Sequence, residues 1–168
     1  MKPRLGVSAY ALVCAVLLIT ACAAPTPAPL LVNAAFWHGR LALRIEPGLP
    51  DGTPQAFSAG FELSGNAQSG TLTLLTPLGS TAADMTWSPG SASLRSNGEA
   101  RQFESLDALL RGAVGTDVPV VALFAWLRGE AMTLTGWSAD LSQYASGRIT
   151  ARRLQPAPAT ELTLLLEP

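Results

Sequence analysis

Apolar and polar residues alternate along much of the chain after residue 35. In the stretch "FWHGRLALRIE", Trp37, Leu41, Leu43 and Ile45 share one face, and the charged residues lie on the other. Side chains of a β-strand alternate between the two faces of a sheet, so this pattern predicts a half-buried strand. The same alternation recurs in "AFSAGFEL" (56–63), "GTLTLL" (70–75) and "TAADMTW" (81–87).

A tight hairpin is expected at Asn97 and Gly98, between the stretches "SASLRS" and "EARQF". A two-residue hairpin turn requires positive φ angles, which an Asn-Gly pair adopts readily. Further short strands fit "MTLTGW" (132–137), "GRITARRL" (147–154) and "ELTLLLE" (161–167). About eight or more strands of this kind predict an antiparallel sheet with one apolar and one polar face.

Two segments have helical periodicity instead. "SLDALLRG" (105–112) offers Ser105 as an N-cap and ends at a glycine. "DVPVVALFAWLRG" (117–129) offers Asp117 as a cap and Gly129 as a C-terminal stop, and it is apolar on nearly all sides. We therefore expect these helices to lie across the apolar face of a curled sheet. That sheet either encloses a cavity or is packed solid, and periodicity does not separate the two.

The first 22 residues, "MKPRLGVSAYALVCAVLLITAC", follow the order of a bacterial export signal. Lys2 and Arg4 precede an apolar run too short for a comfortable membrane span. The closing "ITAC" resembles a lipobox, which implies cleavage after Ala21 and acylation of Cys22, and the alanine that follows implies sorting to the outer membrane. A plain signal peptide or an anchor helix with an incidental cysteine is the alternative.

These features divide the chain into three expected parts. Residues 1–21 are the lipoprotein signal peptide, and residues 22–35 are the lipidated Cys22 with a Pro- and Ala-rich tether. Residues 36–168 suit a single domain with one core. We expect this domain to be monomeric and held at the outer membrane, facing the periplasm.

Charge and composition exclude several functions. Removal of residues 1–21 takes Lys2 and Arg4 from the 11 basic residues, and the remaining 9 face 12 acidic residues, a net charge of −3. Lys2 is the only lysine, while Cys14 leaves with the signal peptide and Cys22 is acylated. The mature chain therefore lacks a basic stripe for nucleic acid, a lysine for Schiff-base chemistry and a free thiol.

Catalytic groups are also sparse. His38 is the only histidine, which excludes multi-histidine metal sites, and it lies on the polar face of a predicted strand. Asp84 and Asp107 could form a carboxylate pair, but nothing in the sequence fixes their separation. The chain has neither a G-x-S-x-G elbow nor a Gly-Lys-Ser/Thr phosphate loop. We therefore expect no enzymatic activity, no metal and no cofactor.

The chain resembles the LolB family of outer-membrane lipoprotein receptors. The resemblance runs from about residue 36 to the C-terminus through "FWHGRLALR", "FSAGFEL", "LTLLTPLGSTAADM", "LLRGAVG" and "VPVVALFAWLRG". It implies a mostly β fold with an α lid: an unclosed antiparallel β-barrel of about eleven strands, covered by short helices, around an apolar cavity. The C-terminal stretch from residue 147 looks shorter than in some members and ends without an aromatic residue.

The resemblance also implies a function. A LolA-like periplasmic carrier delivers an acylated lipoprotein, and the receptor shelters its acyl chains in the cavity and inserts them into the inner leaflet of the outer membrane. Pro77, Leu78 and Gly79 match the family's membrane insertion loop, and Leu78 is the residue that enters the bilayer. The alternative from the residues alone is a leucine that folds back onto the sheet.

Apolar residues on the predicted inner face are the candidates for the lipid cavity, and ordinary core packing is the alternative for each. They are Trp37, Leu41, Leu43, Phe57, Phe61, Leu63, Leu72, Leu74, Met85, Trp87, Leu106, Leu110, Val120, Phe124, Trp126 and Leu127.

Two other functions fit the anchor and the sheet. A structural lipoprotein adaptor of an outer-membrane assembly machine would need a flat exposed patch instead of a cavity. An anchored hydrolase would need a nucleophile or an acid–base pair, for which His38 is the only evident candidate.

Overall fold

The computed structural model describes residues 35–47, 53–115 and 117–168. The signal peptide, Cys22 and all of the tether except Ala35 lie outside the described residues. Nine strands and two α-helices, with one short 3-10 helix, make up the described chain. The strands are β1 (Phe36–Ile45), β2 (Gln55–Gly65), β3 (Gly70–Leu75), β4 (Thr81–Ser88), β5 (Ser91–Ser96), β6 (Glu99–Phe103), β7 (Trp137–Asp140), β8 (Arg148–Arg153) and β9 (Thr160–Leu166).

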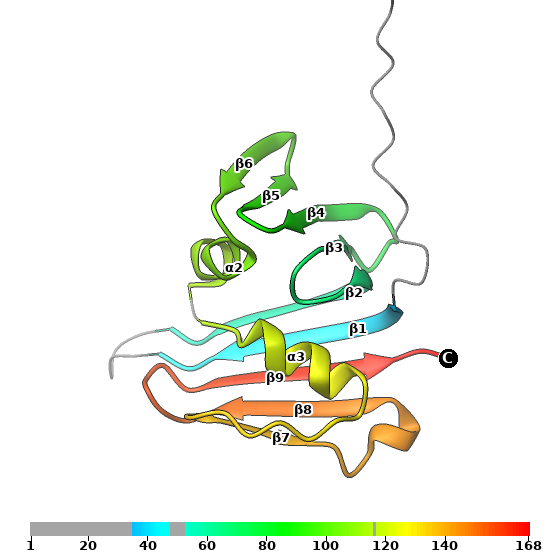
Figure 1. The fold of residues 1–168 in the computed structure, drawn as a ribbon, viewed down its shortest axis with the longest axis vertical. Coiled ribbons are helices and arrows are strands. Elements are labelled where there is room, and N and C mark those ends of the chain that lie inside the picture. The colour runs from blue at the N-terminus through cyan, green and yellow to red at the C-terminus, as the bar shows by residue number, and fades with distance from the viewer. Residues whose placement is uncertain (1–34, 48–52, 116) are drawn as a thin grey trace, which may run out of the picture. The chain divides into compact units, whose positions relative to one another are not determined.

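All nine strands form one antiparallel sheet in the order β6-β5-β4-β3-β2-β1-β9-β8-β7. The first strand pairs with the last, while β6 and β7 are the two edges, so the described strands leave the sheet unclosed (Figure 1). The expected mostly β, unclosed antiparallel architecture is confirmed. The described residues form nine strands, fewer than the eleven that the resemblance implies.

The predicted strand at 132–137 is wrong. Only an isolated bridge joins Leu134 to Trp137, and the Trp137 amide donates to the Leu134 carbonyl at 3.1 Å, which closes a turn. Gly136 has a φ of +83°, which a regular strand does not allow. Strand β7 therefore begins at Trp137, where the prediction ended.

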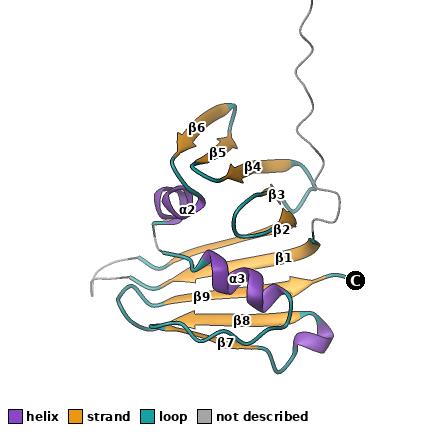
Figure 2. Ribbon diagram, in the orientation of Figure 1, coloured by secondary structure: helices purple, strands orange, loops and turns teal. Residues whose placement is uncertain are grey.

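The helices connect the two edges of the sheet. After β6 the chain forms α2 (Leu106–Val114) and α3 (Val120–Leu127), and it then enters β7 (Figure 2). Helix α2 starts as predicted, since the Ser105 hydroxyl accepts from the Ala108 amide at 3.1 Å, but it ends at Gly115 instead of Gly112. Helix α3 is shorter than the predicted 117–129 and has Pro119, not Asp117, at its N-cap.

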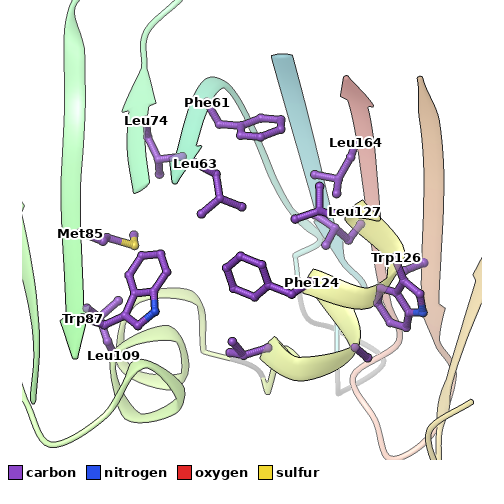
Figure 3. Close-up of a cluster of buried hydrophobic side chains, with 14 of the residues drawn as sticks. Phe61, Leu63, Leu74, Met85, Trp87, Leu109, Phe124, Trp126, Leu127 and Leu164 are labelled. Carbon is purple, nitrogen blue, oxygen red and sulfur yellow. The ribbon is translucent and has the colours of Figure 1, made fainter. Parts of the chain in front are cut away.

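Helix α3 is buried on several sides, as its composition predicts. Six of its eight residues are buried, and Trp126 is fully enclosed. Phe124 reaches Trp37 of β1 at 5.8 Å and Trp87 of β4 at 6.3 Å between ring centroids. Figure 3 shows Phe124 between Trp87 and Met85 on one side and Leu127 on the other, so α3 lies at the centre of the apolar interior.

The C-terminal end of α3 is fixed by side-chain hydrogen bonds. Trp37 Nε1 and the Tyr144 hydroxyl both donate to the Leu127 carbonyl at 3.0 Å. Gly129 follows with a φ of +74°, and a Cβ placed there would lie 2.7 Å from the Tyr144 ring. This position thus requires glycine both for its backbone and for its close approach to an aromatic ring.

We expect Gly129→Ala to lower the free energy of unfolding by about 1–3 kcal/mol, since it adds overpacking to an unfavourable backbone conformation. Gly90→Ala is the matched control, because Gly90 has a φ of +78° and no atom within 4 Å of its added Cβ. Urea unfolding of both variants measures the difference. Equal losses would show that the Tyr144 contact contributes nothing.

Candidate functional site

A wholly apolar cavity of about 120 Å³ lies between the inner face of the sheet and the helices. Strands β1 to β4 and β9 form its walls, and α2, α3 and the segment between them supply the remaining side chains. All fifteen lining residues are leucine, valine, phenylalanine or methionine. A space with these walls can accept a hydrocarbon chain but offers no hydrogen-bonding group.

Ten of the sixteen candidate cavity residues line this space. They are Leu41, Leu43, Phe57, Phe61, Leu63, Leu72, Leu74, Met85, Leu110 and Leu127. The other six do not line it and pack elsewhere in the core: Trp37, Trp87, Leu106, Val120, Phe124 and Trp126. The indole Nε1 of Trp87 donates to the Asn66 carbonyl at 2.9 Å, and that of Trp126 donates to the Met132 carbonyl at 3.3 Å. Trp37 donates to the Leu127 carbonyl, as described above, so all three tryptophans among these six residues are held by hydrogen bonds to the backbone.

Five lining residues were not among the candidates: Val114, Val118, Leu123, Leu162 and Leu164. Leu162 and Leu164 lie on one face of β9, so strand alternation could have identified them. Val114 follows Leu110 by four residues on α2, which is the spacing of one helical face. Val118 lies between the helices and has no periodic signal.

A second, larger space of about 510 Å³ adjoins the cavity and is more open to water. The two spaces share five lining residues, Leu43, Phe57, Leu74, Met85 and Val114, so they lie next to each other. We call the larger space the mouth. It differs from the cavity in having four polar lining residues: Gln55, Ser96, Asn97 and Arg101.

The strand register places the mouth at one end of the sheet. Ile45 at the end of β1 pairs with Gln55, the first residue of β2. Ser96 at the end of β5 pairs with Ala83 near the start of β4. The β3–β4 loop leaves β3 toward this same end, because Leu75 pairs with Thr81 across that loop. The loop with the exposed Leu78 therefore extends toward the end of the sheet at which the interior opens.

The β3–β4 loop is a compact turn with a leucine at its tip. The Thr76 amide donates to the Ser80 carbonyl at 2.8 Å, and the Gly79 amide donates to the Thr76 carbonyl at 2.9 Å. The two hydroxyls of Thr76 and Ser80 are also 2.8 Å apart. Leu78 is 95% exposed, so it does not fold back onto the sheet. The loop therefore holds a large apolar side chain in water.

Ionisable groups of the described residues lie away from the cavity. Arg128 and Glu130 pair at 2.9 Å after α3, and the hydrogen bond from Arg128 lowers the pKa of the Glu130 carboxyl. Both side chains are exposed, so the pair stabilises the fold little. His38 faces the outer side of β1, with its Nδ1 3.9 Å from Glu167. Among the residues described, no group of three or more His, Cys, Asp or Glu could hold a metal ion.

Neither of the two described α-helices is long and apolar enough to cross a bilayer.

Comparisons with known proteins identify relatives of this chain. The family model described as "Outer membrane lipoprotein LolB" matches residues 37–157. The outer-membrane lipoprotein LolB of Bordetella pertussis is 37% identical over 126 residues, which cover 63% of this chain and 62% of that protein. The protein of the same name from Bordetella petrii is 31% identical over 164 residues, which cover 83% of this chain and 81% of that protein. This chain thus spans 62% of the length of the Bordetella pertussis protein and 81% of the length of the Bordetella petrii protein.

Proposed function

Since the chain belongs to the LolB family of outer-membrane lipoproteins, we propose that it is a lipid-anchored receptor for acylated lipoproteins. The sequence resemblance predicted this family. The receptor accepts its cargo from a LolA-like periplasmic carrier and releases it into the inner leaflet of the outer membrane. It acts as a monomer anchored through Cys22 at the outer membrane of a Gram-negative bacterium. The transfer needs no covalent chemistry, because the acyl chains move intact between apolar environments.

The observation that carries this proposal is a wholly apolar cavity that adjoins a mouth at one end of the sheet. An acyl chain in water costs about 0.8 kcal/mol for each exposed CH₂ group. Transfer across an aqueous compartment therefore needs an apolar shelter at each stage. A flat patch, which the structural adaptor alternative needs, provides no such shelter.

The cavity must enlarge to hold its cargo. Its volume of about 120 Å³ is below the roughly 300–1,000 Å³ of sites that bind small molecules. Val114 in the last turn of α2 lines both spaces, and it is the only helical residue among the five that do. The end of α3 is tied to Trp37 and Tyr144. We therefore infer that displacement of α2, and not of the end of α3, joins the two spaces when cargo enters.

Phe57 provides the test of this proposal. It lines both the cavity and the mouth, yet 47% of its surface is exposed, so the fold depends little on it. We expect the full chain with Cys22→Ala, which lacks the acylation site, to bind a fluorescent fatty acid. Adding Phe57→Asp should weaken that binding by about tenfold or more, because it puts a charge on the path of the chain.

The control for Phe57→Asp is Phe36→Asp, an equally drastic change of an exposed phenylalanine on β1 that lines neither space. It should leave the affinity for the fatty acid unchanged. A parent chain that binds no acyl probe would contradict the receptor function, and co-purification with an outer-membrane β-barrel protein would then favour the adaptor.

A further inference from the structure

The mouth has one polar side, which the apolar cavity lacks. Of its four polar lining residues, Ser96 donates its hydroxyl to the Ala82 carbonyl at 3.0 Å and is thereby used within the fold. Arg101 supplies the only charge among the residues that line the mouth. Gln55 and Asn97 add amide groups from β2 and from the β5–β6 turn. The mouth therefore places hydrogen-bond donors beside the entrance to a hydrocarbon space.

The register places Arg101 on the inner face of the sheet, where its side chain is exposed at the mouth. Arg101 of β6 pairs with Leu94 of β5, and Leu94 pairs with Met85 of β4. Directly opposed residues on neighbouring antiparallel strands share one face of the sheet. Leu94 and Met85 are both buried in the apolar core, so Arg101 ends an inward-facing row at the edge of the sheet.

The guanidinium of Arg101 lies over an aromatic ring and forms no ion pair with a carboxylate of the described residues. Its central carbon lies 5.7 Å from the centroid of the Phe103 ring, on the same strand. Glu99 lies two residues along the same face, but none of the ion pairs in the described residues includes Arg101. The cation is thus available to a ligand in the mouth.

We propose that Arg101 binds the ester and amide carbonyl oxygens at the head of an acylated cysteine whose chains occupy the cavity. This inference rests on the proposed receptor function and names the group that the mouth recognises. An arginine carries five N–H donors and no acceptor, whereas the ester groups of an acylglycerol carry only acceptors. Those carbonyl groups would leave water as the chains enter the mouth, and their desolvation is unfavourable unless a donor replaces the water.

The test compares two probes on the full chain with Cys22→Ala. The first is a synthetic lipopeptide whose cysteine carries two ester-linked chains and one amide-linked chain. The second carries its two glycerol-linked chains through ether bonds and keeps the amide-linked chain, so it lacks the ester carbonyl groups and has the same net charge. Arg101→Ala should weaken binding of the first probe by about tenfold or more, as expected for loss of hydrogen bonds to a charged group, and weaken binding of the second by less.

Arg95→Ala is the matched control, because Arg95 is an exposed arginine of the neighbouring strand β5 that does not line the mouth. It should affect neither probe. Unfolding in urea checks that all variants are folded, and Arg101→Gln, which keeps an amide donor, should lose less affinity than Arg101→Ala.

Each remaining outcome overturns the inference. Equal loss of both probes would mean that Arg101 only shapes the mouth, and no loss of either would mean that it has no role in binding. A palmitate probe serves as an anionic comparison, and loss confined to palmitate would assign Arg101 to a carboxylate or phosphate instead. If the parent chain binds neither probe, the receptor function itself fails, so the two proposals are tested separately.

Discussion

A Leu78→Glu variant is expected to bind acylated cargo as tightly as the parent chain and to fail to deliver it to liposomes. Leu78 is 95% exposed at the tip of the β3–β4 loop, so its replacement removes no contact of the fold. Insertion of a leucine into hydrocarbon contributes about 1.5–3 kcal/mol, and a glutamate would have to be dehydrated or protonated to enter. We therefore expect delivery to fall by at least about tenfold.

The measurement follows a radiolabelled or fluorescent lipoprotein from the variant to liposomes that are separated by flotation. Phe36→Glu is the control, since Phe36 is also an exposed apolar residue but lies at the start of β1, where it pairs with Ser64 near the opposite end of the sheet. Delivery by Leu78→Glu at the parental rate would refute the insertion role, and a parallel loss of cargo binding would place Leu78 in uptake instead.

A Leu72→Trp variant should fold normally and lose most of its affinity for acyl chains. Leu72 lines the cavity and is only half-buried, and its cross-strand partners Leu63 and Met85 line the same space. A tryptophan there fills existing space, so it should cost little stability while occupying the volume that a chain would need. We expect the dissociation constant for a fluorescent fatty acid to rise by about tenfold to a hundredfold.

Leu75→Trp is the control for Leu72→Trp, because Leu75 lies on the same strand but does not line the cavity. It should leave the affinity for the fatty acid unchanged. If Leu72→Trp binds the fatty acid as well as the parent chain does, acyl chains do not enter this cavity.

Strand alternation predicted most of the sheet, because one face of each strand is buried. The Asn97-Gly98 turn formed as expected, with φ angles of 53° and 80°, since few other residue pairs adopt both values. The prediction failed at 132–137, where alternating threonines and apolar residues suggested a strand. A turn at Leu134–Trp137 formed instead, and a period-2 pattern over six residues does not distinguish the two.

The residues that line the cavity could mostly be predicted from the sequence, but the side chains that fill the rest of the interior could not. Alternation identified inward-facing residues such as Phe61 and Leu63, but it could not tell a residue that lines a space from one that fills it. Trp126 and Phe124 belong to the second kind, because α3 lies inside the sheet and packs on several sides. Arg101 was not singled out at all, since only the cross-strand register with Leu94 shows that this charged residue faces inward.

The position of the two sheet edges determines how the interior can change its size. Because β6 and β7 do not pair with each other in the described chain, the helical connection and its contacts span the interval between them. Widening that interval would therefore separate apolar contacts and break none of the interstrand hydrogen bonds. A closed barrel has a circumference fixed by its strand number and shear, whereas β6 and β7 leave this sheet open, so the width of its interior can change while the nine described strands remain paired.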